Sequence, residues 1–357
     1  MQNNTNLGKM IRLDDDIDEV VSLVDITEQP NIQNDLPNHS YIEYTDCDKN
    51  IDNHIDNHID NNISNISIII NHSILDIKLP VILVDTSYTT FHRFFATIRW
   101  FSFANKDAFK EHKDDNTYDW SKDPTFIEKY TKMYLESIIN LVTRKVFNDS
   151  IVIFCQDAPS DTLWRHEFAE CYKGNRLDLS EKYNFKPTFK YTFDTLIPKL
   201  IKENNNIHSL LIPKMEADDL IALAAKFIKY KRTSKITYII SGDNDFLQLG
   251  HDKLYIADYK KDYLIHLTKE EAREALRLKI VGGDCSDNIP SIFKDQTIGN
   301  KIKKAVKENK TEMKRFLAEN DIARKQYNMN KKIISFRYIP KHFRKPVYKS
   351  INKLIIN

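Results

Sequence analysis

The stretch VILVD, residues 81–85, decides the fold class because it is a short apolar run that ends in an acid. The same pattern recurs in IVIFCQD at residues 151–157 and in ITYIISGDND at residues 236–245. Such runs are typical of buried strands, and longer helical patterns such as residues 217–230, ADDLIALAAKFIKY, lie between them. Strands that alternate with helices predict an α/β fold with a mostly parallel central sheet and helices on both faces.

Carboxylates gather at the expected carboxyl ends of these strands, which is the edge where such sheets bind ligands. Others open the helix at residues 217–230 or lie in GGDCSDNIP, residues 282–290. One such acid alone is as readily a turn residue or a helix cap. Together they would repel one another unless cations lay between them. The nine acids are Asp85, Asp157, Glu216, Asp218, Asp219, Asp243, Asp245, Asp284 and Asp287.

The chemistry of these side chains indicates which cation they would bind. All nine offer hard oxygen ligands, and neither His nor Cys belongs to the set, which favours Mg²⁺ or Mn²⁺ over zinc. Two such ions about 3.5–4 Å apart are the usual device for in-line attack on a phosphodiester. The sequence therefore predicts a metal site suited to cutting nucleic acid.

The charge of the chain divides at Lys78. The first 78 residues carry four Lys/Arg against fifteen Asp/Glu, a net charge of −11, and the remainder carries +13, although the whole chain is only +2. A body with that excess is suited to binding polyanions, with nucleic acid the first candidate. Residues 1–77 include the near repeat IDNHIDNHIDNNISNIS. We expect this acidic, Asn/Ile-rich leader to be disordered.

Several classes of protein are excluded by composition. No apolar run approaches the roughly 18 residues that span a bilayer, and the N-terminus lacks the features of a signal peptide. Four scattered Cys form neither a disulfide framework nor a CxxC pair, which favours a reducing compartment. We therefore expect an intracellular protein without a membrane partner, in the nucleus, the cytoplasm or a viral replication compartment.

The order of these segments resembles the 5′-nuclease or flap endonuclease superfamily, which includes the 5′-exonuclease domain of bacterial DNA polymerase I and T-even phage RNase H. The resemblance covers residues 81–340, and the Asn/Ile-rich leader fits the AT-rich genome of a large DNA virus. It implies a structure-specific 5′-3′ exonuclease or flap endonuclease, with RNase H activity in its range, that acts in DNA replication and repair. The segments on which the resemblance rests are VILVDTS, FCQDAPSDTLWRHEFAECYKGNR, MEADDLIA, SGDNDFLQL and GGDCSDNIP.

Within this resemblance, the nine acids match the metal ligands of the family. The first ion is implied to bind Asp85, Asp157, Glu216, Asp218 and Asp243. The second ion or its water shell is implied to involve Asp219, Asp245, Asp284 and Asp287. The resemblance therefore implies two Mg²⁺ ions as cofactors, with Mn²⁺ able to replace them.

Basic and aromatic residues match the family's contacts with its substrate. Lys173 and Arg176 in YKGNR match catalytic residues that can neutralise charge developing on the phosphate. Tyr172 matches an aromatic that can stack on an unpaired base, and Arg165 is assigned with it to DNA binding. Without the resemblance, we would expect Tyr172 to be a core aromatic and Lys173 a solvated lysine.

A duplex-binding element is implied after residue 282. GGDCSDNIPSI followed by IGNKIKKAV resembles the helix-hairpin-helix-like element of the family, although Thr297 stands where its hairpin usually begins with glycine. Helix starts and basic residues at such an element can contact phosphates of the duplex backbone. The residues predicted to do so are Lys301, Lys303 and Lys304.

The predicted organisation has three parts: the leader at residues 1–77, an α/β nuclease core at residues 78–275, and a helical duplex-binding region with a basic tail at residues 276–357. We expect a monomer that acts on DNA with a 5′ end, a flap or an RNA primer. One alternative is a catalytically silent DNA-structure-binding module, which should have lost an acid of the set. Another is a PIN-type RNase that cuts single-stranded RNA, a class that is usually shorter and lacks GDxSDNIP.

Overall fold

A computed structural model of the chain describes residues 79–169, 172–174, 183–230, 236–261, 263–294 and 298–356. The predicted leader, the predicted catalytic Arg176 and the hairpin position Thr297 lie outside these residues. All the described residues belong to one unit of the chain. No helix among them is long and apolar enough to cross a membrane.

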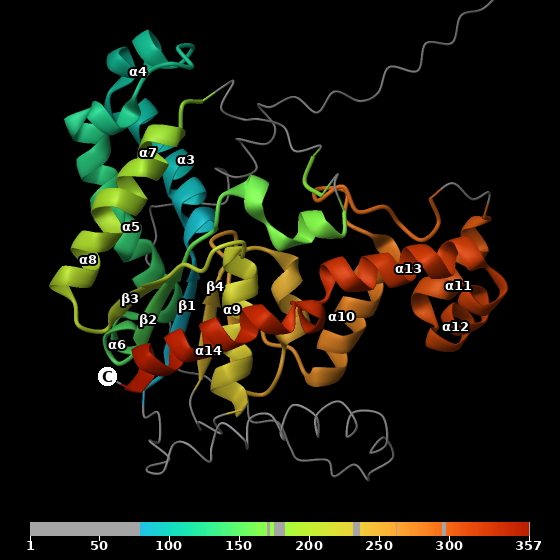
Figure 1. The fold of residues 1–357 in the computed structure, drawn as a ribbon. Coiled ribbons are helices and arrows are strands. Elements are labelled where there is room, and N and C mark those ends of the chain that lie inside the picture. Colours follow the sequence, from blue (N-terminus) through green and yellow to red (C-terminus); the bar gives the residue numbers. More distant parts are fainter. Residues whose placement is uncertain are drawn as a thin grey trace, which may run out of the picture. The chain divides into compact units, whose positions relative to one another are not determined.

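Among the described residues, five parallel strands form one sheet in the order β3-β2-β1-β4-β5 (Figure 1). The central strand β1 pairs with β2 on one side and with β4 on the other, and β3 and β5 form the edges. Because all are parallel, their carboxyl ends meet at one edge of the sheet. The strands are β1 (Val81–Asp85), β2 (Ile151–Cys155), β3 (Ile207–Leu210), β4 (Thr237–Ile240) and β5 (Leu254–Ala257).

Helices cover both faces of the sheet, which explains why its central strands are apolar throughout. Val81 and Leu83 of β1 pack in one apolar cluster with α9 and α14 (Lys341–Ile356), whereas Ile82 and Val84 pack in another with α3 and α5. The helices up to β5 are α3 (Thr86–Ala104), α4 (Lys106–His112), α5 (Pro124–Val142), α6 (Arg144–Asn148), α7 (Lys186–Tyr191), α8 (Ile197–Glu203) and α9 (Ala217–Tyr230). Short helical turns that carry site residues are η3 (Trp164–Glu167) and η6 (Asn244–Leu249).

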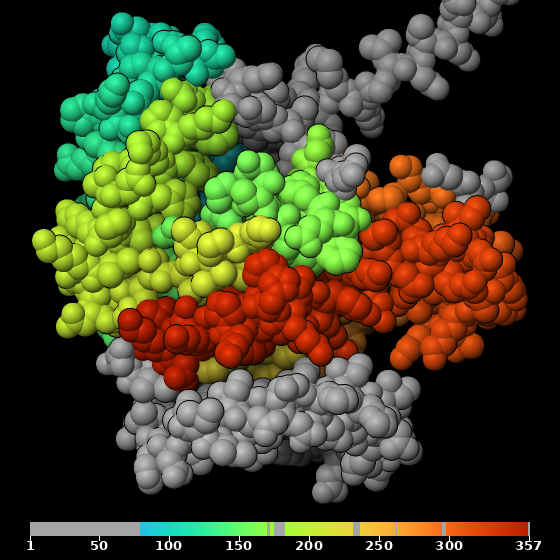
Figure 2. All heavy atoms as spheres, in the orientation of Figure 1, coloured from blue at the N-terminus to red at the C-terminus, as the bar shows by residue number. Residues whose placement is uncertain are grey.

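A helical region follows the sheet and has an apolar cluster of its own, which includes Val281, Ile292 and Val306. The domain boundary suggested at residue 276 falls inside its first helix, α10, which packs against η6 and α13. The green segment around η3 lies against the red end of α13 (Figure 2). The helices are α10 (Lys269–Gly282), α11 (Asn300–Glu308), α12 (Lys310–Glu319), α13 (Asp321–Ile334) and α14 (Lys341–Ile356).

The predicted fold class is confirmed, with a parallel sheet between helices and a helical C-terminal region. The three predicted strands contain β1, β2 and β4, and α9 has the predicted bounds. The edge strands β3 and β5 were not predicted; two of the four residues of β3 are the polar His208 and Ser209, which interrupt its apolar pattern. The basic tail after Pro340 forms α14, which buries Val347 and Ile351 against the layer of α9.

Candidate metal centre

Two of the predicted acids lie at the carboxyl ends of β1 and β2 and bind the starts of helices. Asp85 ends β1 and caps α3: Oδ1 accepts a hydrogen bond from the backbone N–H of Tyr88 at 3.1 Å, and Oδ2 accepts one from the hydroxyl of Ser241 at 3.0 Å. Asp157, just beyond β2, accepts a hydrogen bond from the backbone N–H of Ala217 at 2.7 Å. These bonds fix both carboxylates at the edge where the strands end.

The environment of Asp85 disfavours its charged form. Burial raises the pKa of Asp85 to about 7, and the nearby Asp157 and Asp243 add to the rise. Hydrogen bonds from Tyr88 and Ser241 lower the pKa but do not cancel the effect of burial. A cation beside these carboxylates would offset both the burial and the repulsion.

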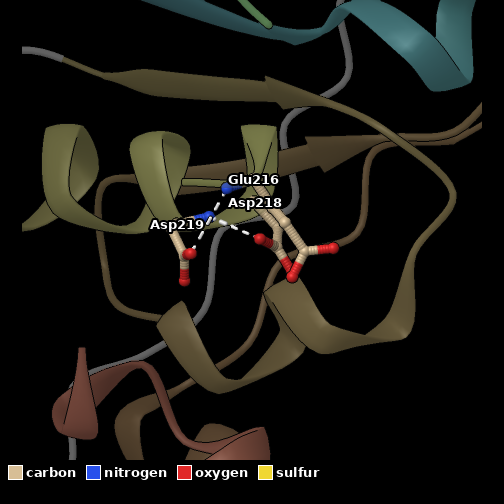
Figure 3. Close-up of side chains that lie close together, drawn as sticks. All are labelled: Glu216, Asp218 and Asp219. Atoms are coloured by element: carbon tan, nitrogen blue, oxygen red, sulfur yellow. Dashed lines mark hydrogen bonds between the residues drawn. The ribbon is translucent and has the colours of Figure 1, made fainter. Parts of the chain in front are cut away.

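Three acids at the start of α9, Glu216, Asp218 and Asp219, form a set that we call the first acidic group. One oxygen from each lies within 4.8 Å of the others. Figure 3 shows the three side chains at the first turn of α9, where Asp218 accepts a hydrogen bond from the backbone N–H of Asp219 at 2.6 Å. The first acidic group therefore presents several carboxylate oxygens at one place in the fold.

A buried arginine binds the first acidic group. Arg165 in η3 donates to the two oxygens of Asp219 at 2.9 and 2.8 Å and to Glu216 at 2.6 Å. Its Nε donates to the carbonyl of Ile333 at 3.2 Å, and the indole of Trp164 donates to Asp219 at 2.7 Å. Both oxygens of Asp219 thus accept hydrogen bonds from protein groups. Asp219 thus groups with Glu216 and Asp218, whereas the sequence assigned it to the second ion or its water shell.

Arg165 is buried, although the sequence assigned it to DNA binding. Only 2 % of the residue is exposed. The reason is its partners, which lie 51 and 54 residues further along the chain and could not be inferred from the local motif.

The three acids of the first acidic group differ in ionisation. Burial raises the pKa of Asp218 well above its usual value and raises that of Asp219 as well. Burial also opposes ionisation of Glu216, but Arg165 and Lys173 outweigh it and lower the pKa of Glu216 below its usual value. Glu216 is therefore the member of the group that most readily carries a negative charge.

Tyr172 and Lys173 join this group to another part of the site. The hydroxyl of Tyr172 donates to Glu216 at 3.1 Å and to Asp287 at 3.2 Å. Lys173 forms an ion pair with Glu216, and its backbone N–H donates to the carbonyl of Asp287 at 3.0 Å. Lys173 has φ 59°, a conformation that is uncommon outside glycine. Tyr172 is only 4 % exposed, so its ring does not face solvent as the predicted stacking on a base requires.

Asp245, Asp284 and Asp287 form a further set, which we call the second acidic group, and their ligand atoms also lie within 4.8 Å of one another. Asp245 lies in η6, and the other two follow α10. The chain turns into this loop at Gly283, whose φ is 72° and where an added Cβ would lie 2.4 Å from the carbonyl of Ile289. That turn places the loop acids beside Asp245.

Lys279, in the last turn of α10, binds the second acidic group and was not among the predicted residues. Its ammonium lies 2.9 Å from Asp284 and also pairs with Asp245. Burial raises the pKa of Asp245 to about 6. For Asp284, burial is outweighed by hydrogen bonds from Ser286 and Lys279, which lower the pKa. The sequence offered one indication of this role, which is that Lys279 lies about one helical turn before the loop that carries Asp284 and Asp287.

The remaining predicted residues are Asp243, which is bonded to the acids already described, and three lysines that lie in the helical region. Asp243 accepts a hydrogen bond from the backbone N–H of Asp245 at 2.8 Å, and its own N–H donates to the hydroxyl of Ser241 at 3.2 Å, which also binds Asp85. The nine predicted acids are thus linked around one edge of the sheet. The predicted duplex contacts Lys301, Lys303 and Lys304 lie on α11, in the helical region.

One family and several known proteins are similar to this chain over more than half of its length. Residues 80–277, more than half of the chain, match the family described as 5′-3′ exonuclease, N-terminal resolvase-like domain. The chain is 26 % identical over 225 residues to a 5′-3′ exonuclease of Buchnera aphidicola, covering 61 % of this chain and 67 % of that protein. It is 26 % identical over 225 residues to ribonuclease H of Enterobacteria phage T4, covering 58 % of this chain and 72 % of that protein.

The fold is similar to that of crystal structures from bacteriophage T5. One is a protein co-crystallised with metal ions, with a TM-score of 0.52 and 18 % identity over 77 % of this chain and 99 % of that chain. Another is a flap endonuclease in complex with DNA and metal ions, with a TM-score of 0.52 and 18 % identity over 78 % of this chain and 100 % of that chain. At this identity, the likeness establishes a common fold.

Proposed function

Because the chain belongs to the family of 5′-3′ exonuclease N-terminal, resolvase-like domains, we propose that it is a divalent-metal-dependent, structure-specific 5′-nuclease. It hydrolyses phosphodiester bonds near 5′ ends or flaps during DNA replication and repair, and RNA primers paired with DNA are within its substrate range. The observation that carries the proposal is the convergence of two acidic groups, joined through Tyr172, at the edge where the parallel strands end.

The donor set fits two hard divalent cations. Every candidate ligand is a carboxylate oxygen, which suits Mg²⁺, with Mn²⁺ as a substitute. The raised pKa values of Asp85 and Asp245 support a cation at each place, because positive charge would favour their ionised forms. The first ion would be held by Asp85, Asp157, Glu216, Asp218 and Asp243. The second would be held by Asp245, Asp284 and Asp287.

Bound there, the two ions would supply Lewis-acid activation of water and stabilisation of the leaving oxygen. Lys173 then has a catalytic role in our proposal, because its ammonium, next to Glu216, can approach a phosphate at the same edge and neutralise its developing charge. Arg176 shares that role and lies outside the described residues. Arg165 is a positioning residue, since it holds Glu216 and Asp219 without facing solvent.

Substrate binding is divided between two regions in the proposal. Tyr172 is assigned to the 5′ strand, which requires its ring to leave the buried position between Glu216 and Asp287 when DNA binds. Lys301 and Lys304 on α11 are exposed, and with Lys303 they can contact the phosphates of a duplex. The protein works as an intracellular monomer.

Cleavage assays on four 5′-labelled substrates test the function. They are a 5′ flap, a blunt duplex, an RNA–DNA hybrid and free single-stranded RNA, each with Mg²⁺ and with EDTA. We expect Mg²⁺-dependent products released near the 5′ end or at the flap junction. Tight binding of the flap without any cleavage would identify a silent binding module, and cleavage of free RNA alone would identify a PIN-type RNase. Either result contradicts the proposal.

A further inference from the structure

Lys279 is placed among the carboxylates that the proposed function assigns to the second metal ion. Its ammonium lies 2.9 Å from Oδ2 of Asp284 and pairs with Oδ1 of Asp245. Both acids belong to the second acidic group. A divalent cation that binds this group must therefore share its oxygens with the ammonium or displace it.

The side chain of Lys279 is able to move away from the two carboxylates. It is 19 % exposed, and its flexible four-carbon stem carries a compact, strongly hydrated charge. Arg165 in the first acidic group differs in each respect. Its side chain is 3 % exposed, binds Asp219 through two nitrogens and donates a hydrogen bond to the carbonyl of Ile333. A divalent cation can therefore displace the ammonium of Lys279 from its carboxylates, whereas the guanidinium of Arg165 stays in place.

We propose that Lys279 competes with the metal ion at the second acidic group and sets the affinity of that site. The ammonium neutralises negative charge on Asp245 and Asp284 until a divalent cation replaces it. The site therefore binds its ion more weakly than the three carboxylates would without Lys279. This inference rests on the proposed function, since it takes the second acidic group to be a metal site. It adds a residue that controls occupancy of the site without being a ligand.

Mn²⁺ binding to the full chain, without substrate, tests the competition. Free Mn²⁺ is followed by electron paramagnetic resonance during a titration of wild type and of Lys279→Met, which keeps the stem and removes the charge. We expect one site of the variant to bind Mn²⁺ at least about tenfold more tightly, which is the effect of one unit charge on a divalent ion roughly 6 Å away in a water-like medium. Lys279→Arg retains the charge and should bind Mn²⁺ no more tightly than wild type does.

Control variants separate the charge of Lys279 from its packing. Lys269→Met changes an exposed lysine on the same helix and should leave the affinity unchanged. Thermal unfolding in EDTA shows that each variant is folded, and Lys279→Gln takes the place of Lys279→Met if the latter fails to fold. Unchanged or weaker Mn²⁺ binding in the folded neutral variant overturns the competition while leaving a cleaving enzyme intact. Absence of Mn²⁺ binding in every variant overturns the competition together with the proposed function.

Discussion

The two acidic groups lie at the same edge of the sheet, but each is bound by a different kind of cation. In the first acidic group, the guanidinium of Arg165 is buried and makes two hydrogen bonds to Asp219 and one to Glu216. In the second, Lys279 offers a single ammonium on a partly exposed stem to Asp245 and Asp284. Guanidinium is rigid and weakly hydrated, whereas ammonium is mobile and strongly hydrated. The first group is therefore built into the fold, and the second can exchange its cation.

Arg165→Met should have the largest effect on stability, because it removes the buried guanidinium of the first acidic group. It leaves Glu216 and Asp219 buried without their main partner, and loss of one side of a buried ion pair costs about 3–5 kcal/mol. We expect that loss in the free energy of unfolding, measured by urea denaturation in EDTA at pH 7. Arg273→Met, at an exposed arginine of α10, is the control and should change stability by less than about 0.5 kcal/mol. Equal stability of both variants would show that Arg165 does not hold the first acidic group.

The contrast between these two cations also explains what the sequence could and could not predict. Asp85, Asp157 and Asp243 were predictable because each follows an apolar strand, so the position of the acid follows from the position of the strand. The ion pairs of Arg165 with Glu216 and Asp219, and of Lys279 with Asp245, were not predictable, because these partners are distant in the chain and only the fold brings them together. Residue type alone indicates a surface position for both.

The pH dependence of stability sharpens the comparison, because Asp245 and Glu216 respond in opposite directions. Burial raises the pKa of Asp245 to about 6, above its usual 3.8, so its contribution to stability is lost as the pH rises through 6. The pKa of Asp85 is raised to about 7, so the stability that its protonated form contributes is lost as the pH rises to neutral. For Glu216, Arg165 outweighs burial and lowers the pKa, so its contribution is present above about pH 4.5 and is lost at lower pH.

Asp245→Asn should therefore reduce the fall in the free energy of unfolding between pH 4 and pH 6. Glu216→Gln should leave the part of that fall between pH 5 and pH 6 in place, because the contribution of Glu216 is already complete above about pH 4.5. Urea titrations of the metal-free proteins at several pH values between 4 and 7.5 measure both slopes. A slope in Asp245→Asn as steep as in wild type would mean that Asp245 is not the group that titrates.

The smallest effect is expected at lysines outside both acidic groups. Lys301 and Lys304 on α11 are exposed, and Lys304 forms a surface pair with Glu308 at 3.8 Å. Their double replacement by Ala should weaken duplex binding and reduce the slope of log affinity against log salt by about two. Mn²⁺ affinity should not change, in contrast to Lys279→Met. A salt slope equal to that of wild type would exclude α11 from the DNA interface.

Mg²⁺-dependent cleavage of a 5′-labelled flap by Asp85→Ala tests the central claim most directly, namely that the acids at the strand ends form the catalytic centre. Asp149→Ala is the matched control, since Asp149 is an exposed carboxylate just before β2, at the opposite end of the strands. We predict that Asp85→Ala binds the flap substrate with nearly the affinity of wild type but does not cleave it, and that Asp149→Ala cleaves at the wild-type rate. Unchanged turnover in Asp85→Ala would contradict the account.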